Sequence, residues 1–143
     1  RGYNLSAYDN AVNNLLSIRI APIVHMIIGL PGETISDYTA TAKYIAQSGE
    51  SGIKISLLHI LKDTDLYTDY CNGLFNAMTI EDYLYAIGAI LPVLPENMVV
   101  HRLTGDGPKN ILAAPLWTTD KKRVLNTLHH YLKENMIYQG KDL

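Results

Sequence analysis

Apolar residues recur along this chain with two periods, one typical of helices and the other of strands. Helical spacing predicts amphipathic helices over residues 5–15, 34–49, 64–71, 79–91 and 119–135. Shorter apolar runs predict strands over residues 23–28, 53–60 and 98–103. The strand–helix–strand order of residues 23–60, with its short connections, favours a right-handed parallel crossover and therefore an α/β fold.

Alternation within the second predicted strand separates two faces of the expected sheet. Ile53, Ile55 and Leu57 share one face, and the residues between them, Lys54 and Ser56, share the other. In a barrel the apolar face packs against helices, so Lys54 and Ser56 are expected to face the interior. A charge is unusual there unless something polar lies beside it.

The same alternation turns His25, Ile27 and Gly29 inward on the first strand, which ends in the glycine-rich turn 29–34. Gly29 and Gly32 lack a Cβ, so the backbone can bend sharply and a ligand can approach closely. The carboxyl ends of parallel strands are common ligand sites. Local pattern leaves two alternatives open, an ordinary strand-to-helix turn and a ligand contact, and the spacing excludes a P-loop.

Composition narrows the class of protein. The chain has 143 residues, one domain's length, and a net charge of -2 with Lys and Arg spread along it, so there is no clear signal for nucleic acid or an anionic membrane. No apolar run reaches membrane-spanning length, and the first residues do not show the pattern of a signal peptide. Cys71 is the single cysteine, so an internal disulfide is excluded, and a cytoplasmic setting fits this. We expect Cys71 to be a small buried apolar residue.

A second polar cluster follows the third predicted strand, where His101, Arg102 and Asp106 are close in sequence. Arg102 and Asp106 can form an ion pair that braces the loop, or Arg102 can clamp a carboxylate or phosphate of a substrate. Both interpretations stay open. His25, His59 and His101 lie on three different predicted strands, but their different heights favour ordinary histidines over a metal site.

Taken together, five segments, residues 1–3, 25–34, 52–62, 101–106 and 138–140, resemble the C-terminal half of YhcC-type radical S-adenosylmethionine proteins. The resemblance covers essentially the whole chain. It implies a partial (β/α) barrel, of which this chain supplies about three parallel strands with flanking helices. It also implies that the intact protein holds S-adenosylmethionine and a four-iron four-sulfur cluster, and performs radical chemistry on an unassigned substrate.

The resemblance also implies roles for particular residues. The first strand and its turn would lie against the adenosine end of the cofactor, through Ile27, Gly29, Pro31 and Gly32. The end of the next strand would contact the adenine, through His59, Ile60 and Leu61. Lys54, His101, Arg102 and Asp106 are the candidates for contacts with the substrate or for supporting residues that make them.

Two departures from the family pattern matter. Position 25 is His where glycine often stands, which weakens the expected adenine contact. The three clustered cysteines that hold the cluster are absent, so we expect no metal ligands in this chain. The chain is therefore expected to be a fragment of an enzyme, inactive alone.

The expected division places the second half of the barrel in residues 1–62 and a C-terminal extension in residues 63–143. Half a barrel leaves the strand 23–28 with an unpaired edge, which favours pairing or swapping with a second copy. A different class of function also stays open, a self-contained module that binds a nucleotide or phosphate at the 29–34 turn without redox chemistry.

Overall fold

The computed structural model describes every residue except 1, 3 and 106, and it shows an α/β fold. The α-helices are α1 (Leu5–Ser17), α2 (Ile35–Gln47), α3 (Asp65–Cys71), α4 (Ile80–Ile90) and α5 (Lys121–Glu134). The strands are β1 (Ile23–Ile28), β2 (Gly52–Leu57), β3 (Ile60–Leu61), β4 (Val99–Arg102) and β5 (Leu112–Ala114). Two short 3-10 helices, η1 (Leu91–Val93) and η2 (Leu116–Thr119), follow α4 and β5. In the described part of the chain, none of the helices combines the length and the apolar character needed to span a bilayer.

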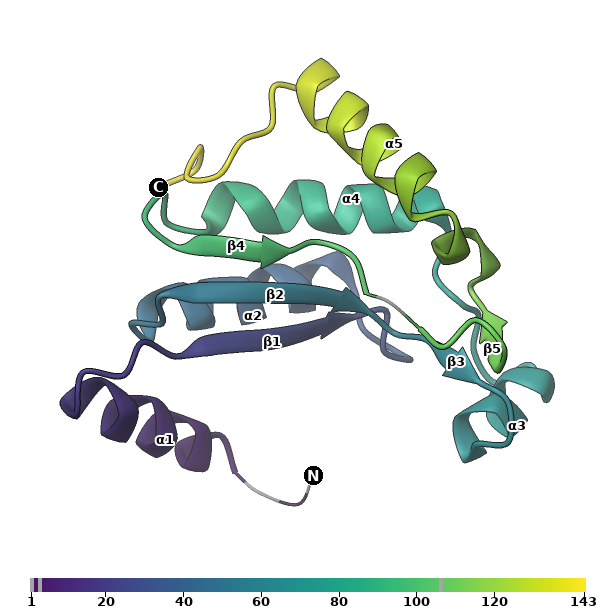
Figure 1. Ribbon diagram of the computed structural model, residues 1–143, viewed down its shortest axis with the longest axis horizontal. Coiled ribbons are helices and arrows are strands. Elements are labelled where there is room, and N and C mark those ends of the chain that lie inside the picture. The colour runs from purple at the N-terminus through teal and green to yellow at the C-terminus, as the bar shows by residue number, and fades with distance from the viewer. Residues whose placement is uncertain (1, 3, 106) are drawn as a thin grey trace.

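Three of the strands form a parallel sheet in the order β1–β2–β4 (Figure 1). The pairing of β1 with β2 runs without a break from Ile23 opposite Gly52 to Ile28 opposite Leu57. The predicted parallel crossover is confirmed, as is the fold class of about three parallel strands with flanking helices. Among the described residues, β1 forms one edge of this sheet and β4 the other.

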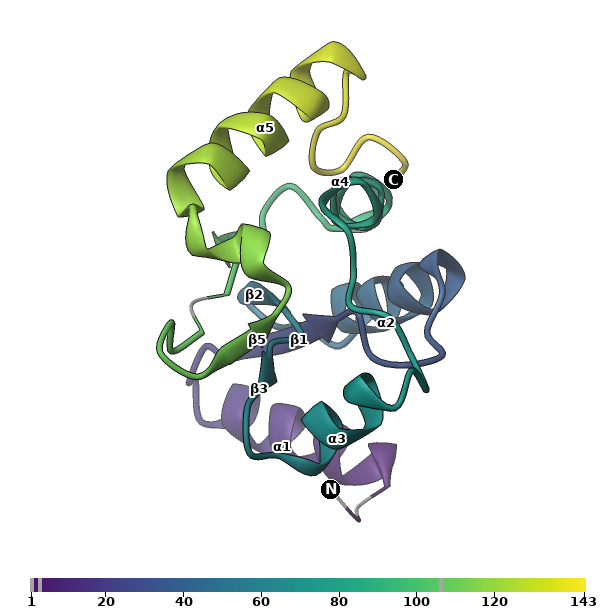
Figure 2. The same ribbon diagram turned by 90° about the vertical axis from the view of Figure 1, so that its right-hand side faces the viewer.

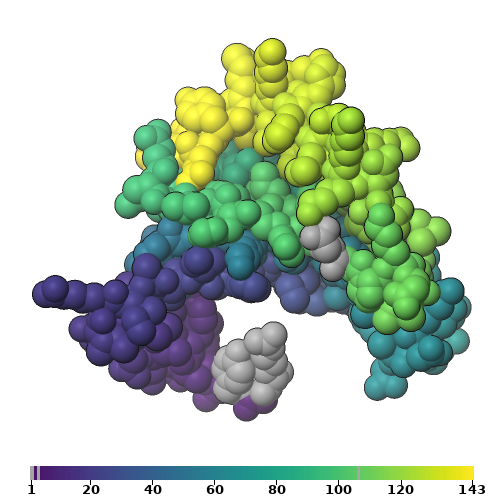
Figure 3. All heavy atoms as spheres, in the orientation of Figure 1, coloured from purple at the N-terminus to yellow at the C-terminus, as the bar shows by residue number. Residues whose placement is uncertain are grey.

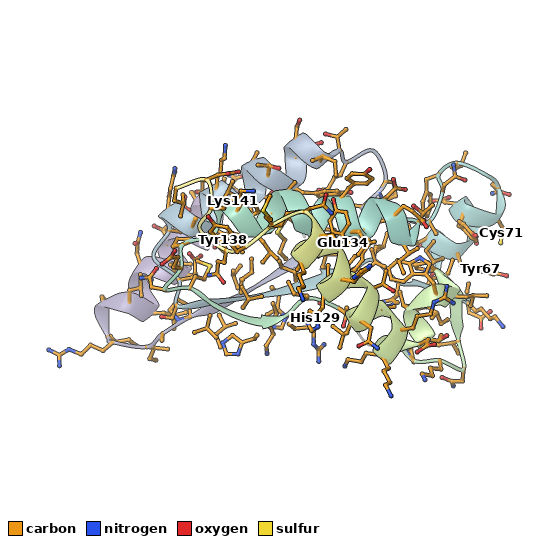
Figure 4. The ribbon with its side chains drawn as sticks, turned by 90° about the horizontal axis from the view of Figure 1, so that it is seen from above. Tyr67, Cys71, His129, Glu134, Tyr138 and Lys141 are labelled. Atoms are coloured by element: carbon orange, nitrogen blue, oxygen red, sulfur yellow. The ribbon has the colours of Figure 1, made fainter. Side chains whose placement is uncertain are left out.

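One face of the sheet is covered by α2 and α4, which lie on the same side of the strands (Figure 4). The buried residues from the strands and these two helices include Met26, Ile28, Tyr38, Ala42, Ile45, Ile53, Ile55, Leu57, Tyr83, Ile87 and Ile90. The other face is open, with Ile27 45% exposed and Val99 55% exposed. Lys54 and Ser56 are half-buried between fully buried neighbours, so the alternation predicted for β2 is confirmed.

Helix α2 begins with a capping box. The Thr34 side chain accepts from the backbone of Asp37, and the Asp37 carboxylate accepts from the Thr34 N–H at 2.7 Å. Ile35, in the first turn of the helix, is 42% exposed, whereas Tyr38, Ala42 and Ile45 are buried. Gly49 or Gly52 was expected to end the helix, and Gly49, with φ +88°, is the one that follows its last turn.

The range predicted for the second strand was too long. The strand ends at Leu57 rather than at Ile60, and the N–H of Leu58 makes the last bond to β1, at 2.9 Å from the Ile28 carbonyl oxygen. The chain then turns, and β3 pairs antiparallel with β5 in a second, two-stranded sheet. Apolar residues continue from β2 into β3, so the sequence does not show that the pairing partner changes between these two strands.

The second sheet and α3 lie beyond the carboxyl ends of β1 and β2, in front of them when the molecule is viewed along the strands (Figure 2). Helix α4 and strand β4 come from the part of the chain expected to be an extension, yet they share the core and the sheet of the first part. The division at residue 62 stays a prediction.

Candidate functional site

The strand ends of the parallel sheet meet at one edge, and their residues are close in space. A Cβ added to Gly29, after β1, would lie 3.2 Å from the Leu57 Cδ1 atom at the end of β2. A Cβ added to Gly105, in the loop after β4, would lie 3.7 Å from the Leu57 backbone nitrogen. The segments at the ends of three different strands are therefore close together, at the edge where parallel α/β folds bind ligands.

The turn after β1 needs glycine at two positions, since Gly29 has φ +85° and Gly32 has φ +84°. The Gly29 N–H donates to the Tyr38 hydroxyl oxygen at 3.1 Å, which ties the turn to α2. Burial raises the pKa of Tyr38, so this hydroxyl keeps its proton and can donate it to a bound group. Nothing in the sequence pattern singled out Tyr38 beyond its place on the buried face of the helix.

A hollow of about 440 Å³ lies beside this turn, lined by residues 29–35 and by residues 75–78 before α4. A Cβ added to Gly32 would meet nothing within 4 Å, so the backbone is exposed to the hollow there. Glu33 also borders the hollow, and burial raises the pKa of its carboxyl group. The hollow therefore offers bare backbone, the Tyr38 hydroxyl and a carboxyl group to a ligand.

The residues after β2 are enclosed by the loop after β4. A Cβ on Gly105 would lie 2.8 Å from the His59 Cε1 atom, and one on Gly107 would lie 3.0 Å from the Cδ2 atom. The loop passes so close to the imidazole ring that side chains at these two positions would collide with it. Ile60 is 1% exposed and pairs with Ala114 of β5, whereas Leu61 is half-buried, so almost none of the surface of Ile60 is open to a ligand in this chain.

The candidate substrate residues come together on the open face of the sheet. His25 on β1 is opposite Lys54 on β2, and Lys54 is opposite Arg102 on β4. The pairing of β2 with β4 shifts by one residue at this point, which places both His101 and Arg102 beside Lys54. Asp106 lies outside the described residues. The membership of His25 in this row could not be predicted, because it depends on the pairing register of the strands.

The imidazole ring of His101 lies over Gly52. A Cβ on Gly52 would be 2.9 Å from the His101 Cδ2 and Nε2 atoms, and also 2.9 Å from the Val99 carbonyl oxygen. In the described part of the chain, no group of three or more His, Cys, Asp or Glu side chains is placed to hold a metal ion.

Cys71 was expected to be buried, and that expectation was wrong. It is exposed, at the last turn of α3, with Tyr67 one turn earlier (Figure 4). Helix α3 is short, and none of its residues is buried, so an apolar residue on it does not imply a core position. A hydrogen bond with Cys71 raises the pKa of the Tyr67 hydroxyl.

With this geometry established, comparison with known proteins gives the family. The family model described as the Radical_SAM C-terminal domain matches residues 51–134, more than half of the chain. The chain belongs to this family. This match and the relatives YtqA and YhcC together confirm the YhcC-type resemblance carried by the sequence motifs.

Relatives within the family are similar over nearly the whole chain. The uncharacterized protein YtqA of Bacillus subtilis (strain 168) is 36% identical over 141 residues, which are 99% of this chain and 44% of YtqA. Protein YhcC of Escherichia coli (strain K12) is 28% identical over 143 residues, 100% of this chain and 46% of YhcC. The chain thus spans less than half the length of these relatives.

The fold of this radical SAM family member also matches a solved structure. The archaeal Methanocaldococcus infernus Elp3 with an N-terminal deletion superposes with a TM-score of 0.80 at 17% sequence identity. The match covers 97% of this chain and 33% of the Elp3 chain. This likeness establishes a shared fold.

Proposed function

We propose that this chain is the C-terminal part of a radical S-adenosylmethionine enzyme, and that its strand ends bind the adenosine end of that cofactor. Membership of the Radical_SAM C-terminal family supports the class of enzyme. The observation that carries the site is the meeting of Gly29, Leu57 and Gly105 at the carboxyl edge of a parallel sheet. When bound in such an enzyme, the cofactor and a four-iron four-sulfur cluster supply one-electron radical chemistry.

The residues of this chain fit the adenosine part and not the cluster. Cys71 is the one cysteine in the sequence and stands on α3, so three thiolate ligands would have to come from elsewhere in the intact protein. The hollow beside the 29–34 turn offers exposed backbone, where a flat purine or a ribose can approach closely. This division of labour makes the chain inactive alone.

Among the described residues no strand pairs with the outer edge of β1, which supports the idea that the sheet continues in the intact protein. A groove of about 390 Å³ is lined by four consecutive residues of β1, Val24 to Ile27, together with residues of α1 and α2. Because neighbouring residues of a strand point to opposite faces, a groove that touches all four runs along the strand's edge. The space-filling view is hollowed below β1, between α1 and the α3 end of the molecule (Figure 3). An additional parallel strand at this edge would extend the sheet toward a barrel.

Binding of S-adenosylmethionine to the intact protein tests the proposal, with two glycine variants as a matched pair. Gly32→Ala and Gly73→Ala both place alanine at a positive φ, +84° and +71°, with nothing within 4 Å of the new Cβ. Both variants therefore carry similar backbone strain, about 1–2 kcal/mol. Gly32 lines the hollow proposed to hold the cofactor, whereas Gly73 follows α3 and does not line it.

The protein is reconstituted with its cluster without oxygen, and the dissociation constant of S-adenosylmethionine is measured by equilibrium dialysis. We expect Gly32→Ala to weaken binding by roughly tenfold, whereas Gly73→Ala leaves it within about twofold of wild type. Formation of 5′-deoxyadenosine after reduction of the cluster is the second readout. Equal dissociation constants for the two variants would contradict the site, and an intact protein that neither binds nor cleaves the cofactor would contradict the class.

A simple further titration separates this proposal from a nucleotide-binding module without redox chemistry. The 143-residue chain alone is titrated with ATP and with S-adenosylmethionine in a calorimeter. The radical enzyme proposal expects no saturable ATP binding, because the adenosine contacts would need the remaining part of the barrel to enclose the ligand. Tight binding of ATP by the chain alone would favour the module.

A further inference from the structure

We propose that His25, Lys54 and Arg102 form a subsite that binds an oxyanion of the substrate, a phosphate or a carboxylate, on the open face of the sheet. The inference rests on the proposed function, since it takes that face to be the interior of the barrel in the intact enzyme. It names a chemical class for a substrate that the family resemblance leaves unassigned.

The strand register places the three side chains in one row. His25 is the Cα partner of Lys54, and Lys54 is the Cα partner of Arg102. Neighbouring strands lie about 4.8 Å apart, so the three Cα atoms span roughly 10 Å. The long side chains of Lys54 and Arg102 can close on one small anion across that width.

Burial shows which face the row occupies. Met26 and Ile55 belong to the core under the helices, so the residues beside them, His25 and Lys54, point to the opposite face. The order on β4 is different, because Val100 and Leu103 both pack against the core while His101 and Arg102 between them are both exposed.

The shift of register accounts for that pattern on β4. It lies between Ile53 and Lys54, so that two residues of β4 take the place of one opposite Lys54. A bulge of this kind re-aims a side chain and is common next to active sites. Without it, Arg102 would alternate to the helix side, away from Lys54.

Charge makes an anion the complementary ligand. The three strands carry a lysine, an arginine and two histidines but no aspartate or glutamate. Lys54 and Arg102 lie side by side on one face, and an oxyanion is a ligand that both side chains bind. Arginine binds phosphate and carboxylate through two parallel N–H bonds, and lysine and imidazole N–H groups can add further donors.

The row is separate from the proposed cofactor site. His25 precedes Gly29 by four residues of extended chain, so the row lies about 13 Å below the carboxyl edge of the sheet. A group bound at the strand ends and a group bound at the row can therefore be measured independently.

The test uses the intact protein, reconstituted with its cluster and saturated with S-adenosylmethionine, in a calorimetric titration. Inorganic pyrophosphate is one probe and succinate is the other, so the two arms distinguish phosphate from carboxylate recognition. The variants are Lys54→Gln and Arg102→Gln. Lys43→Gln is the matched control, because Lys43 is an exposed lysine on α2 and its loss changes the net charge equally.

We expect wild type to bind one of the two probes saturably at one site. Lys54→Gln and Arg102→Gln should each weaken that binding by about tenfold or more, while Lys43→Gln changes it less than about twofold. The dissociation constant of S-adenosylmethionine, measured in the same samples, should stay within about twofold in all variants, which also shows that they are folded.

Three results would overturn the inference. The first is the absence of saturable binding of either probe to wild type. The second is equal binding by Lys54→Gln, Arg102→Gln and Lys43→Gln. The third is a parallel loss of S-adenosylmethionine affinity in the two row variants, which would assign the cations to the carboxylate of the cofactor. A further outcome separates the two proposals. If wild type binds a probe, Lys54→Gln and Arg102→Gln do not, and none of the proteins binds S-adenosylmethionine, then the proposed function fails while the oxyanion subsite stands.

Discussion

Replacing Gly52 by alanine tests the packing that holds β4 against β2. The new Cβ would lie 2.9 Å from two atoms of the His101 ring and 2.9 Å from the Val99 carbonyl oxygen. The ring belongs to an exposed side chain and can move, but the carbonyl belongs to the paired strand. Relief therefore requires a displacement of β4, and overpacking of this kind costs about 1–3 kcal/mol.

A double-mutant cycle with His101→Ala divides this cost into two parts. His101→Ala alone should change the free energy of unfolding by less than about 0.5 kcal/mol, because the side chain is exposed. The double variant should recover about 1 kcal/mol relative to Gly52→Ala, because the contact with the ring is gone while the contact with the carbonyl remains.

Urea denaturation of the purified chain, followed by circular dichroism, measures all four free energies. A loss of about 2 kcal/mol would be a large share of the 5–15 kcal/mol that stabilises a typical domain. The same displacement would separate Arg102 from Lys54, so Gly52→Ala in the intact protein should also weaken the binding of the oxyanion probe. A Gly52→Ala chain as stable as wild type, or a double variant no more stable than Gly52→Ala, would refute this account of the packing.

Three further predictions follow from single features of the fold. Burial raises the pKa of Glu50, so the folded state favours its protonated form, and stability should fall as the pH rises from about 4 through the raised pKa. Glu50→Gln should flatten this part of the stability curve, and parallel curves for the two proteins would contradict it. The edge of β1, which has no partner strand among the described residues, should make the isolated chain associate at high concentration, as measured by light scattering. Ile27→Lys at that edge should reduce association more than Val99→Lys at the other edge. A strictly monomeric wild-type chain would count against this prediction. Tyr83→Phe removes a buried hydroxyl that donates to a backbone carbonyl at 2.8 Å, and it should lower the free energy of unfolding in urea by about 1–2 kcal/mol. Tyr85→Phe, at a 63% exposed position, should lower it by less than about 0.5 kcal/mol. Equal losses would show that the buried hydrogen bond contributes little.

The parts of the fold that depend on local pattern could be predicted from the sequence. Period-two alternation identified the buried face of β2, and helical spacing over residues 34–49 located α2. The glycine turn after β1 was also correct, since both glycines take the positive φ that L-residues avoid. These features are set by residues near one another in the chain.

The parts that depend on pairing could not be predicted. The end of β2 at Leu57 follows from a change of partner, from β1 to β5, that leaves no mark in an apolar run. The bulge on β4 is likewise a property of two strands together, so the sequence suggested Arg102 as a clamp without showing that His25 belongs to the same row. The exposure of Cys71 follows from the position of α3 outside the core.

Trp117 is the one tryptophan in the sequence. Its indole Nε1–H donates to the Met78 carbonyl oxygen at 3.0 Å. Its ring centroid lies 5.3 Å from that of Tyr83 on α4. The side chain therefore bridges η2, the segment before α4 and the helix itself. Selective excitation of this fluorophore would report on that junction alone, so its emission would show whether the region after β5 loosens before the parallel sheet melts.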